Sequence, residues 1–96
     1  MQLEILTPEH QIFSGKVDAV QLPGKDGLFQ VMDNHAPIIS ALKEGQVKID
    51  LLSGVKDFES LHASITVDKS KDKELYLKIK GGVAEMQDNK LILLAD

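Results

Sequence analysis

Hydrophobic and polar residues alternate with a period of two along much of this chain, and this alternation restricts the fold more than any other feature. Between residues 74 and 80, a leucine or isoleucine occupies every second position, with charged residues or tyrosine between them. Residues 46–52 and 60–68 follow the same pattern. Successive side chains of a β-strand point to opposite faces, so each range predicts a strand with one buried face.

Turn-forming residues separate the alternating runs at the spacing of β-hairpins. Glycine, proline, asparagine and aspartate supply turn conformations that other residues resist. Short strands between regular turns indicate a β-sandwich or a β-barrel. No window predicts a convincing helix. Ten strands are predicted, at residues 2–7, 11–14, 17–22, 28–33, 37–42, 46–52, 60–68, 74–80, 82–87 and 90–95.

Two glycine positions and one charged stretch lead to specific expectations. Ser14-Gly15 is expected to be a turn between two short strands. Gly81 and Gly82 follow a strand directly and are expected to form a β-bulge, with a flat docking surface for a partner as the alternative. The charged residues 68–74 are expected to form a solvated hairpin tip.

Length and composition restrict the class of protein. Ninety-six residues predict one domain over 1–96. A net charge of −4 disfavours nucleic acid as a partner, because phosphate binding needs concentrated lysine and arginine. The lack of cysteine excludes disulfides and thiolate metal sites and favours a reducing compartment.

No apolar run approaches the length of a membrane span, so any contact with a membrane is expected to be indirect, through a partner. The first ten residues lack the features of a signal peptide.

No motif for catalysis or cofactor binding is present in the sequence. His10, His35 and His62 are isolated from one another and match no metal-ligand spacing, so no metal site is predicted. No GxSxG elbow occurs, and residues 24–27 are expected to be a hairpin turn, because a phosphate loop needs a helix behind it. We therefore predict no catalytic residue and no cofactor.

Six motifs occur in a recognisable order across nearly the whole chain. Together they resemble the N-terminal β-sandwich domain of bacterial ATP synthase epsilon subunits. The motifs are Leu3–Glu9 with Phe13–Val17, Leu22–Gly27, His35–Ile39, Leu42–Val47, Gly81–Glu85 and Leu93–Asp96.

The resemblance implies an all-β fold, a sandwich of about ten strands in two sheets. It implies a non-catalytic central-stalk (rotor) subunit of a proton-translocating F1Fo ATP synthase. Such a subunit docks on the gamma subunit and on the c-subunit ring, and it helps to couple ion flow with ATP synthesis. It is peripheral, on the cytoplasmic face of the bacterial inner membrane.

Carried over position by position, the resemblance also implies two contact groups. The expected ring-facing residues are Asp26, Gly27, Leu28 and His35. The expected gamma-facing residues are Thr7, Ser40, Lys80, Gly81 and Gly82.

The chain departs from the family pattern in two places. The family's two C-terminal helices are absent after Asp96, so the inhibition and ATP binding associated with those helices are not predicted. The stretch Leu52–Lys73 is longer than the family's hairpin. The alternative function is a small β-sandwich module for carbohydrate or another ligand, which needs a concave face with aromatic residues. A cupin-like enzyme is a third possibility, and it needs clustered histidines.

Overall fold

The computed structural model describes residues 1–52, 62–67, 70–71 and 73–96. These residues form nine β-strands and no helix, which confirms the all-β prediction. Within this part of the chain, no helix is long and apolar enough to span a membrane. The strands are β1 (Gln2–Leu6), β2 (Gln11–Gly24), β3 (Gly27–Met32), β4 (Ile38–Leu42), β5 (Gly45–Leu51), β6 (Ile65–Val67), β7 (Glu74–Ile79), β8 (Gly82–Gln87) and β9 (Lys90–Ala95).

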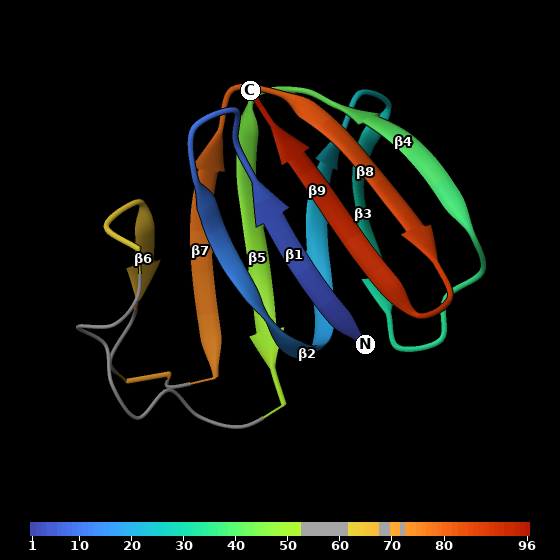
Figure 1. Cartoon of the computed structure of the whole chain (residues 1–96), viewed down its shortest axis with the longest axis horizontal. Coiled ribbons are helices and arrows are strands. Elements are labelled where there is room, and N and C mark those ends of the chain that lie inside the picture. Colours follow the sequence, from blue (N-terminus) through green and yellow to red (C-terminus); the bar gives the residue numbers. More distant parts are fainter. Residues whose placement is uncertain (53–61, 68–69, 72) are drawn as a thin grey trace.

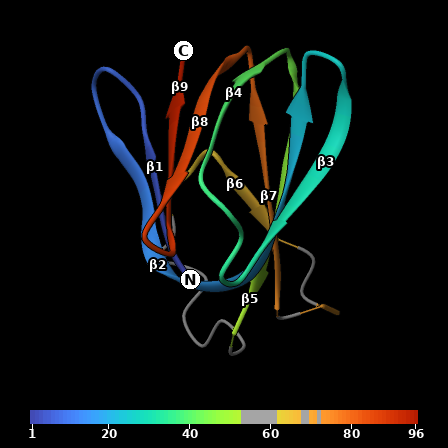
Figure 2. The ribbon, with the colours of Figure 1, turned by 90° about the vertical axis from the view of Figure 1, so that its right-hand side faces the viewer.

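The strands form two packed layers that share the long strand β2. The first layer has the order β4–β8–β9–β1 and ends on the first half of β2. The second half of β2 pairs with β3 on one side and β5 on the other, and β7 and β6 follow β5. Figures 1 and 2 show the layers, with β1, β8 and β9 on one side and β3, β5 and β7 on the other. The predicted two-sheet sandwich is confirmed.

β2 is one strand where the sequence predicted two strands and a turn. Gly15 pairs with Leu3 inside the antiparallel β1–β2 ladder, so the predicted turn at Ser14-Gly15 is wrong. A glycine in a strand interrupts the alternation of side chains without ending the backbone pairing. This merger accounts for the difference between the ten predicted strands and the nine in the described residues.

A β-bulge in β2 lets the strand serve both layers. One extra residue, Asp18, opposes the step between Leu51 and Asp50 of β5. Strict alternation would put Val17 and Val20 on opposite faces, yet both are fully buried in the core. A bulge bends its strand and increases the local twist, so β2 can leave one sheet and enter the other.

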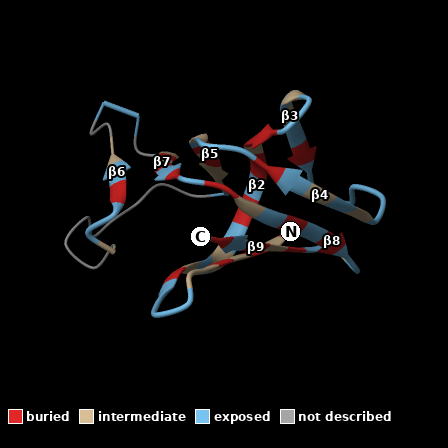
Figure 3. Cartoon of the chain, turned by 90° about the horizontal axis from the view of Figure 1, so that it is seen from above, coloured by how far each residue is buried: buried red, intermediate tan, exposed pale blue. Residues whose placement is uncertain are grey.

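The core lies between the layers and is built from the alternating residues of every strand. Figure 3 shows buried residues interspersed with exposed ones along the strands. Among the described residues no polar or charged side chain is buried. Burial of one such aliphatic side chain stabilises the fold by about 1.5–3 kcal/mol. The largest fully buried side chains are Leu3, Ile5, Leu22, Ile49, Leu75, Met86, Leu91 and Leu93.

Gly81 and Gly82 form the corner through which the chain passes from β7 in one layer to β8 in the other. Their φ angles are +153° and +151°, which residues with a side chain rarely adopt. A Cβ on Gly82 would lie 2.2 Å from the Leu94 carbonyl oxygen of the neighbouring strand. The predicted bulge is therefore wrong, and the glycines are required by this corner.

The region before β7 is described only in part. Residues 65–67 of the predicted strand 60–68 form β6, whereas residues 60, 61 and 68 lie outside the described residues. His62, within the predicted strand 60–68, lies instead in a turn before β6, where its carbonyl accepts a hydrogen bond from the Ile65 amide. Parts of the charged tip 68–74 also lie outside the described residues.

Candidate functional site

The predicted ring-facing residues do not lie together. Asp26, Gly27 and Leu28 form the turn into β3 at the end of the sandwich that carries the C-terminus, here called the upper end (Figure 1). His35 follows β3 at the opposite, lower end, near the N-terminus. The six residues of β3 separate the two positions by about 20 Å. A partner that touches only one end of the sandwich cannot contact both.

The predicted gamma-facing residues share the upper half of the first layer. Thr7 directly follows β1, and its hydroxyl accepts a hydrogen bond from the His10 amide at 3.1 Å. Gly81, in the β7–β8 corner, accepts a hydrogen bond from the Asp96 amide. Ser40 lies in β4 and pairs with Ala84. The structure therefore brings this group together, although Gly81 is buried and offers little surface of its own.

The outer side of β4, β8, β9 and β1, here called the β4–β1 face, carries a row of apolar residues. Leu6, Leu94, Val83 and Ala41 are direct neighbours across these four strands. Leu94 is 52% exposed and Val83 is 41% exposed. Exposed apolar residues that gather on one face commonly mark a surface for a partner.

A second row on the β4–β1 face mixes apolar residues with carboxylates. Glu4, Ile92, Glu85 and Ile39 follow one another across β1, β9, β8 and β4. Ile39 is 76% exposed, more than any other large apolar residue described. The Lys90 ammonium lies 3.4 Å from the Glu4 carboxylate.

The opposite outer side, made by β3, the second half of β2, β5, β7 and β6 and here called the β3–β6 face, is mainly polar. Lys48 lies 3.6 Å from Glu74 and 4.0 Å from Asp50. The Tyr76 hydroxyl donates a short hydrogen bond to Glu74, and this bond, with the nearby lysines, holds the pKa of the Glu74 carboxyl below its ordinary value. Among the described residues, its exposed large apolar side chains lie at the margins and are Leu28 and Met32 on β3 and Leu52 after β5.

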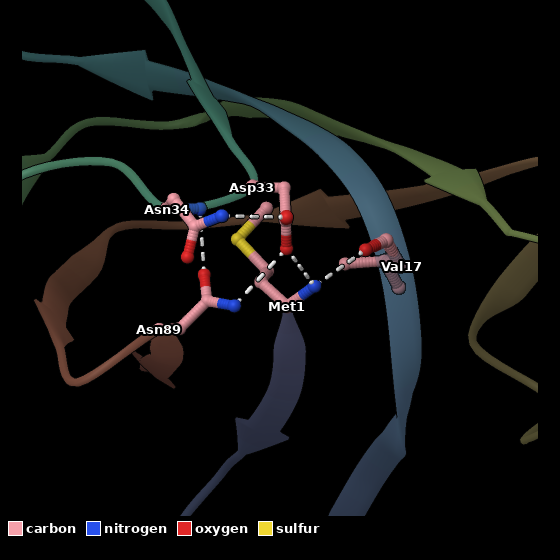
Figure 4. Close-up of polar contacts among 5 residues, drawn as sticks. All are labelled: Met1, Val17, Asp33, Asn34 and Asn89. Carbon is pink, nitrogen blue, oxygen red and sulfur yellow. Dashed lines mark hydrogen bonds and ion pairs between the residues drawn. The ribbon is translucent and has the colours of Figure 1, made fainter.

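A polar cluster closes the lower end (Figure 4). The Met1 ammonium donates to Asp33 at 2.6 Å and to the Val17 carbonyl at 3.0 Å. The Asn34 and Asn89 side-chain amides each donate to the Asp33 carboxylate at 3.1 Å. The hydrogen bond from the ammonium, followed by that from Asn89, lowers the pKa of Asp33. The cluster ties β1, the loop after β3 and the β8–β9 turn together.

Two histidines that are far apart in the sequence meet at the edge of the molecule. The rings of His10 and His62 lie 5.6 Å apart, centre to centre. His62 Nδ1 accepts a hydrogen bond from the Ser64 amide at 3.0 Å, which occupies one of its two ligand nitrogens. Across residues 1–52, 62–67, 70–71 and 73–96 there is no group of three or more metal-ligating side chains.

The sequence did not reveal the apolar face. Residues 91–95 are apolar at every position, so alternation could not separate the buried Leu93 from the exposed Leu94. A continuous apolar strand in an otherwise alternating antiparallel sheet was the available signal, because such a strand has a hydrophobic outer side as well.

Comparison with known proteins identifies the fold. The family described as "ATP synthase, Delta/Epsilon chain, beta-sandwich domain" matches residues 1–63. The ATP synthase epsilon chain of Chlorobium limicola is 41% identical over 95 residues, which cover 99% of this chain and 88% of that protein. The epsilon chain of Chlorobaculum tepidum is 38% identical over 94 residues, which cover 98% and 86%.

A solved structure has the same fold at low sequence identity. A chain in the cryo-EM structure of the Tetrahymena thermophila mitochondrial ATP synthase central stalk and c-ring aligns with a TM-score of 0.70 and 14% identity. The alignment covers 98% of this chain and 61% of that one. The two-layer fold is thus that of the β-sandwich domain of ATP synthase delta and epsilon chains. The chain belongs to the ATP synthase epsilon-chain family.

Proposed function

We propose that this chain is a non-catalytic central-stalk subunit of a proton-translocating F1Fo ATP synthase, which couples ion flow with ATP synthesis by docking on the gamma subunit and the c-ring. Its place is then peripheral, on the cytoplasmic face of the bacterial inner membrane, and it reaches the membrane only through the complex. Family membership and the likeness to a chain of a central-stalk structure support this proposal.

The observation that carries the proposal is the apolar row on the β4–β1 face. A partner that covers this face removes Leu94 and Val83 from water and gains about 25 cal/mol for each Å² of apolar area buried. Thr7, Gly81 and Gly82, three of the predicted gamma-facing residues, lie at the upper margin of this face, whereas Ser40 pairs with the buried Ala84 and points to the inner side of β4. We therefore assign the β4–β1 face to the gamma subunit.

The first test is co-purification of the full chain with its cognate gamma subunit, followed by calorimetry. We expect a one-to-one complex. Leu94→Asp places a charge in the centre of the apolar row, so affinity should fall at least about tenfold, as for the loss of a buried interface residue. Lys78→Glu, on the exposed outer side of β7, is the matched control and should leave affinity unchanged. Absence of binding by the unmodified chain would refute the assignment.

The turn Asp26–Leu28 is the part of the predicted ring-facing group that we assign to the c-ring. Leu28 is 67% exposed at the upper end, whereas His35 lies at the other end of the sandwich. In the assembled synthase, a cysteine replacing Leu28 should form cross-links to the c subunit, and a cysteine replacing His35 should not. Cross-linking from His35 alone would reverse the assignment of the two ends.

A further inference from the structure

Glu85 is a carboxylate on the β4–β1 face with an isoleucine beside it on each neighbouring strand. Its direct neighbours on β9 and β4 are Ile92 and Ile39, and Val83 lies two residues earlier on the same side of β8. Shallow hollows lie on both sides of it, one lined by Pro37 to Ile39 and the other by Asp88, Lys90 and Ile92. Glu85 is thus placed inside the area that a docking partner would cover.

Glu4 provides an internal comparison. Glu4 and Glu85 lie in the same row of the same face, one on each side of Ile92. Lys90 lies 3.4 Å from Glu4, and within the described part of the chain no lysine, histidine or arginine lies within ion-pair distance of Glu85. The β4–β1 face therefore has one carboxylate already neutralised from within the chain and one that is not.

Docking of a partner changes the solvation of the Glu85 carboxylate. While the face is open, water solvates the carboxylate, and its lack of a partner costs little. Once an apolar partner surface covers Ile39, Ile92 and Val83, the carboxylate loses that water, and an unpaired buried charge is strongly unfavourable. A partner that binds this face must therefore supply a cation at this position.

We propose that the surface seated on the β4–β1 face is an apolar patch of the gamma subunit that presents an arginine or lysine to Glu85. This inference rests on the function proposed above and names the chemistry of the partner. The apolar row supplies contact area, and the single ion pair fixes the register in which the two surfaces meet. Charged pairs at interfaces contribute specificity in this way.

The test measures affinity of the full chain for the cognate gamma subunit with Glu85→Gln, Glu85→Lys and the control Asp50→Asn on the opposite β3–β6 face. We expect Glu85→Gln to weaken binding at least about thirtyfold, the effect of removing one partner of a buried ion pair, and Glu85→Lys to weaken it further. Asp50→Asn should change affinity less than about threefold, because Asp50 lies on the opposite β3–β6 face. Affinity of the unmodified chain should also fall more steeply with salt than that of Glu85→Gln.

The possible outcomes separate this inference from the function it rests on. If the unmodified chain binds gamma but Glu85→Gln and Asp50→Asn behave alike, the docking function stands and the ion pair is refuted. If the unmodified chain does not bind gamma, both fail. If Glu85→Gln lowers the free energy of unfolding of the isolated chain by as much as it lowers the free energy of binding, Glu85 has an internal role, and this also refutes the inference. Unfolding curves of all variants are therefore part of the test.

Discussion

The two outer faces of this sandwich are built from the same kind of strand but differ in chemistry. The β4–β1 face carries Leu94, Val83 and Ile39 in adjoining rows, with few charges among them. The β3–β6 face carries Lys48 and Glu74 in a network of ion pairs and a tyrosine hydrogen bond. In the described part of the chain, the buried side chains of both layers are apolar, so packing of the core cannot explain why the outer faces differ.

This difference shows which outer face has its side chains satisfied in the chain without a partner. Charged and hydroxyl groups on the β3–β6 face satisfy one another and water, and surface pairs of this kind add little to stability. Apolar residues on the β4–β1 face gain nothing from exposure, and their gathering on one face is explained by a partner that covers them. The comparison predicts that substitutions on the two faces separate folding from docking.

The largest expected effect comes from the glycines that begin one strand in each layer. Gly82 begins β8 and Gly27 begins β3, with φ angles of +151° and +131°. A Cβ on Gly82 would meet the Leu94 carbonyl oxygen at 2.2 Å, whereas a Cβ on Gly27 meets nothing within 4 Å. Gly82→Ala should therefore destabilise the chain by about 4 kcal/mol, because steric overlap adds to backbone strain, and Gly27→Ala by about 1 kcal/mol from strain alone. Urea unfolding measures both.

Equal costs at the two glycines would show that the close approach of β8 to β9 relaxes freely. A large cost at Gly82 also means that bulky substitutions there report on folding. They cannot be used to map the interface with gamma, although the sequence suggested this position as a contact.

The second prediction compares two adjacent residues of β9 that point to opposite sides. Leu93 is fully buried and Leu94 is 52% exposed on the β4–β1 face. Leu93→Ala should cost about 3 kcal/mol, because it removes buried methyl groups and leaves a cavity. Leu94→Ala should change the free energy of unfolding by less than about 0.5 kcal/mol and should weaken binding to gamma. If Leu94→Ala destabilises the free chain as much as Leu93→Ala, the outer face belongs to the folding core and the comparison between faces fails.

The sequence predicted the strands wherever a single face is buried. In β5 and β7, hydrophobic residues occupy alternate positions, and the structure buries Val47, Ile49, Leu75 and Leu77. In β2 the predicted turn came from Gly15, which instead lies within the strand and pairs with Leu3 of β1. Whether a glycine breaks a strand or lies within it depends on the neighbouring strand, which the sequence pattern does not specify.

The sequence identified candidate contact residues individually, but it did not show which of them lie together. The resemblance to the family supplied Thr7, Ser40 and the glycine corner, and the structure brings them to one end of the first layer. It also grouped Leu28 with His35, which the length of β3 separates. Proximity across strands depends on pairing, so Glu85 and its apolar neighbours from three strands became visible only in the folded chain.

The third prediction concerns the lower end, which belongs to neither face. The pKa of Asp33 is lowered chiefly by its hydrogen bond with the Met1 ammonium. A lowered pKa in the folded state contributes stability above the ordinary carboxyl pKa, and this contribution is lost as the pH falls through the lowered value. Asp33→Asn should therefore be less stable than the unmodified chain at neutral pH, and the difference should shrink in acid. A difference that stays constant with pH would refute the ionic contribution. Binding to gamma should not change.

The smallest expected effect is on the β3–β6 face. Removal of the Tyr76 hydroxyl in Tyr76→Phe takes away the largest cause of the lowered pKa of Glu74, so that pKa should rise toward its ordinary value. Titration of the Glu74 carboxyl by NMR measures the shift, and an unchanged pKa would show that the lysines alone hold the carboxylate. Stability at neutral pH should fall only slightly, because the group lies at the surface. Affinity for gamma should be that of the unmodified chain. A loss of affinity from this change would place a partner on the polar face and would reverse the roles of the two faces.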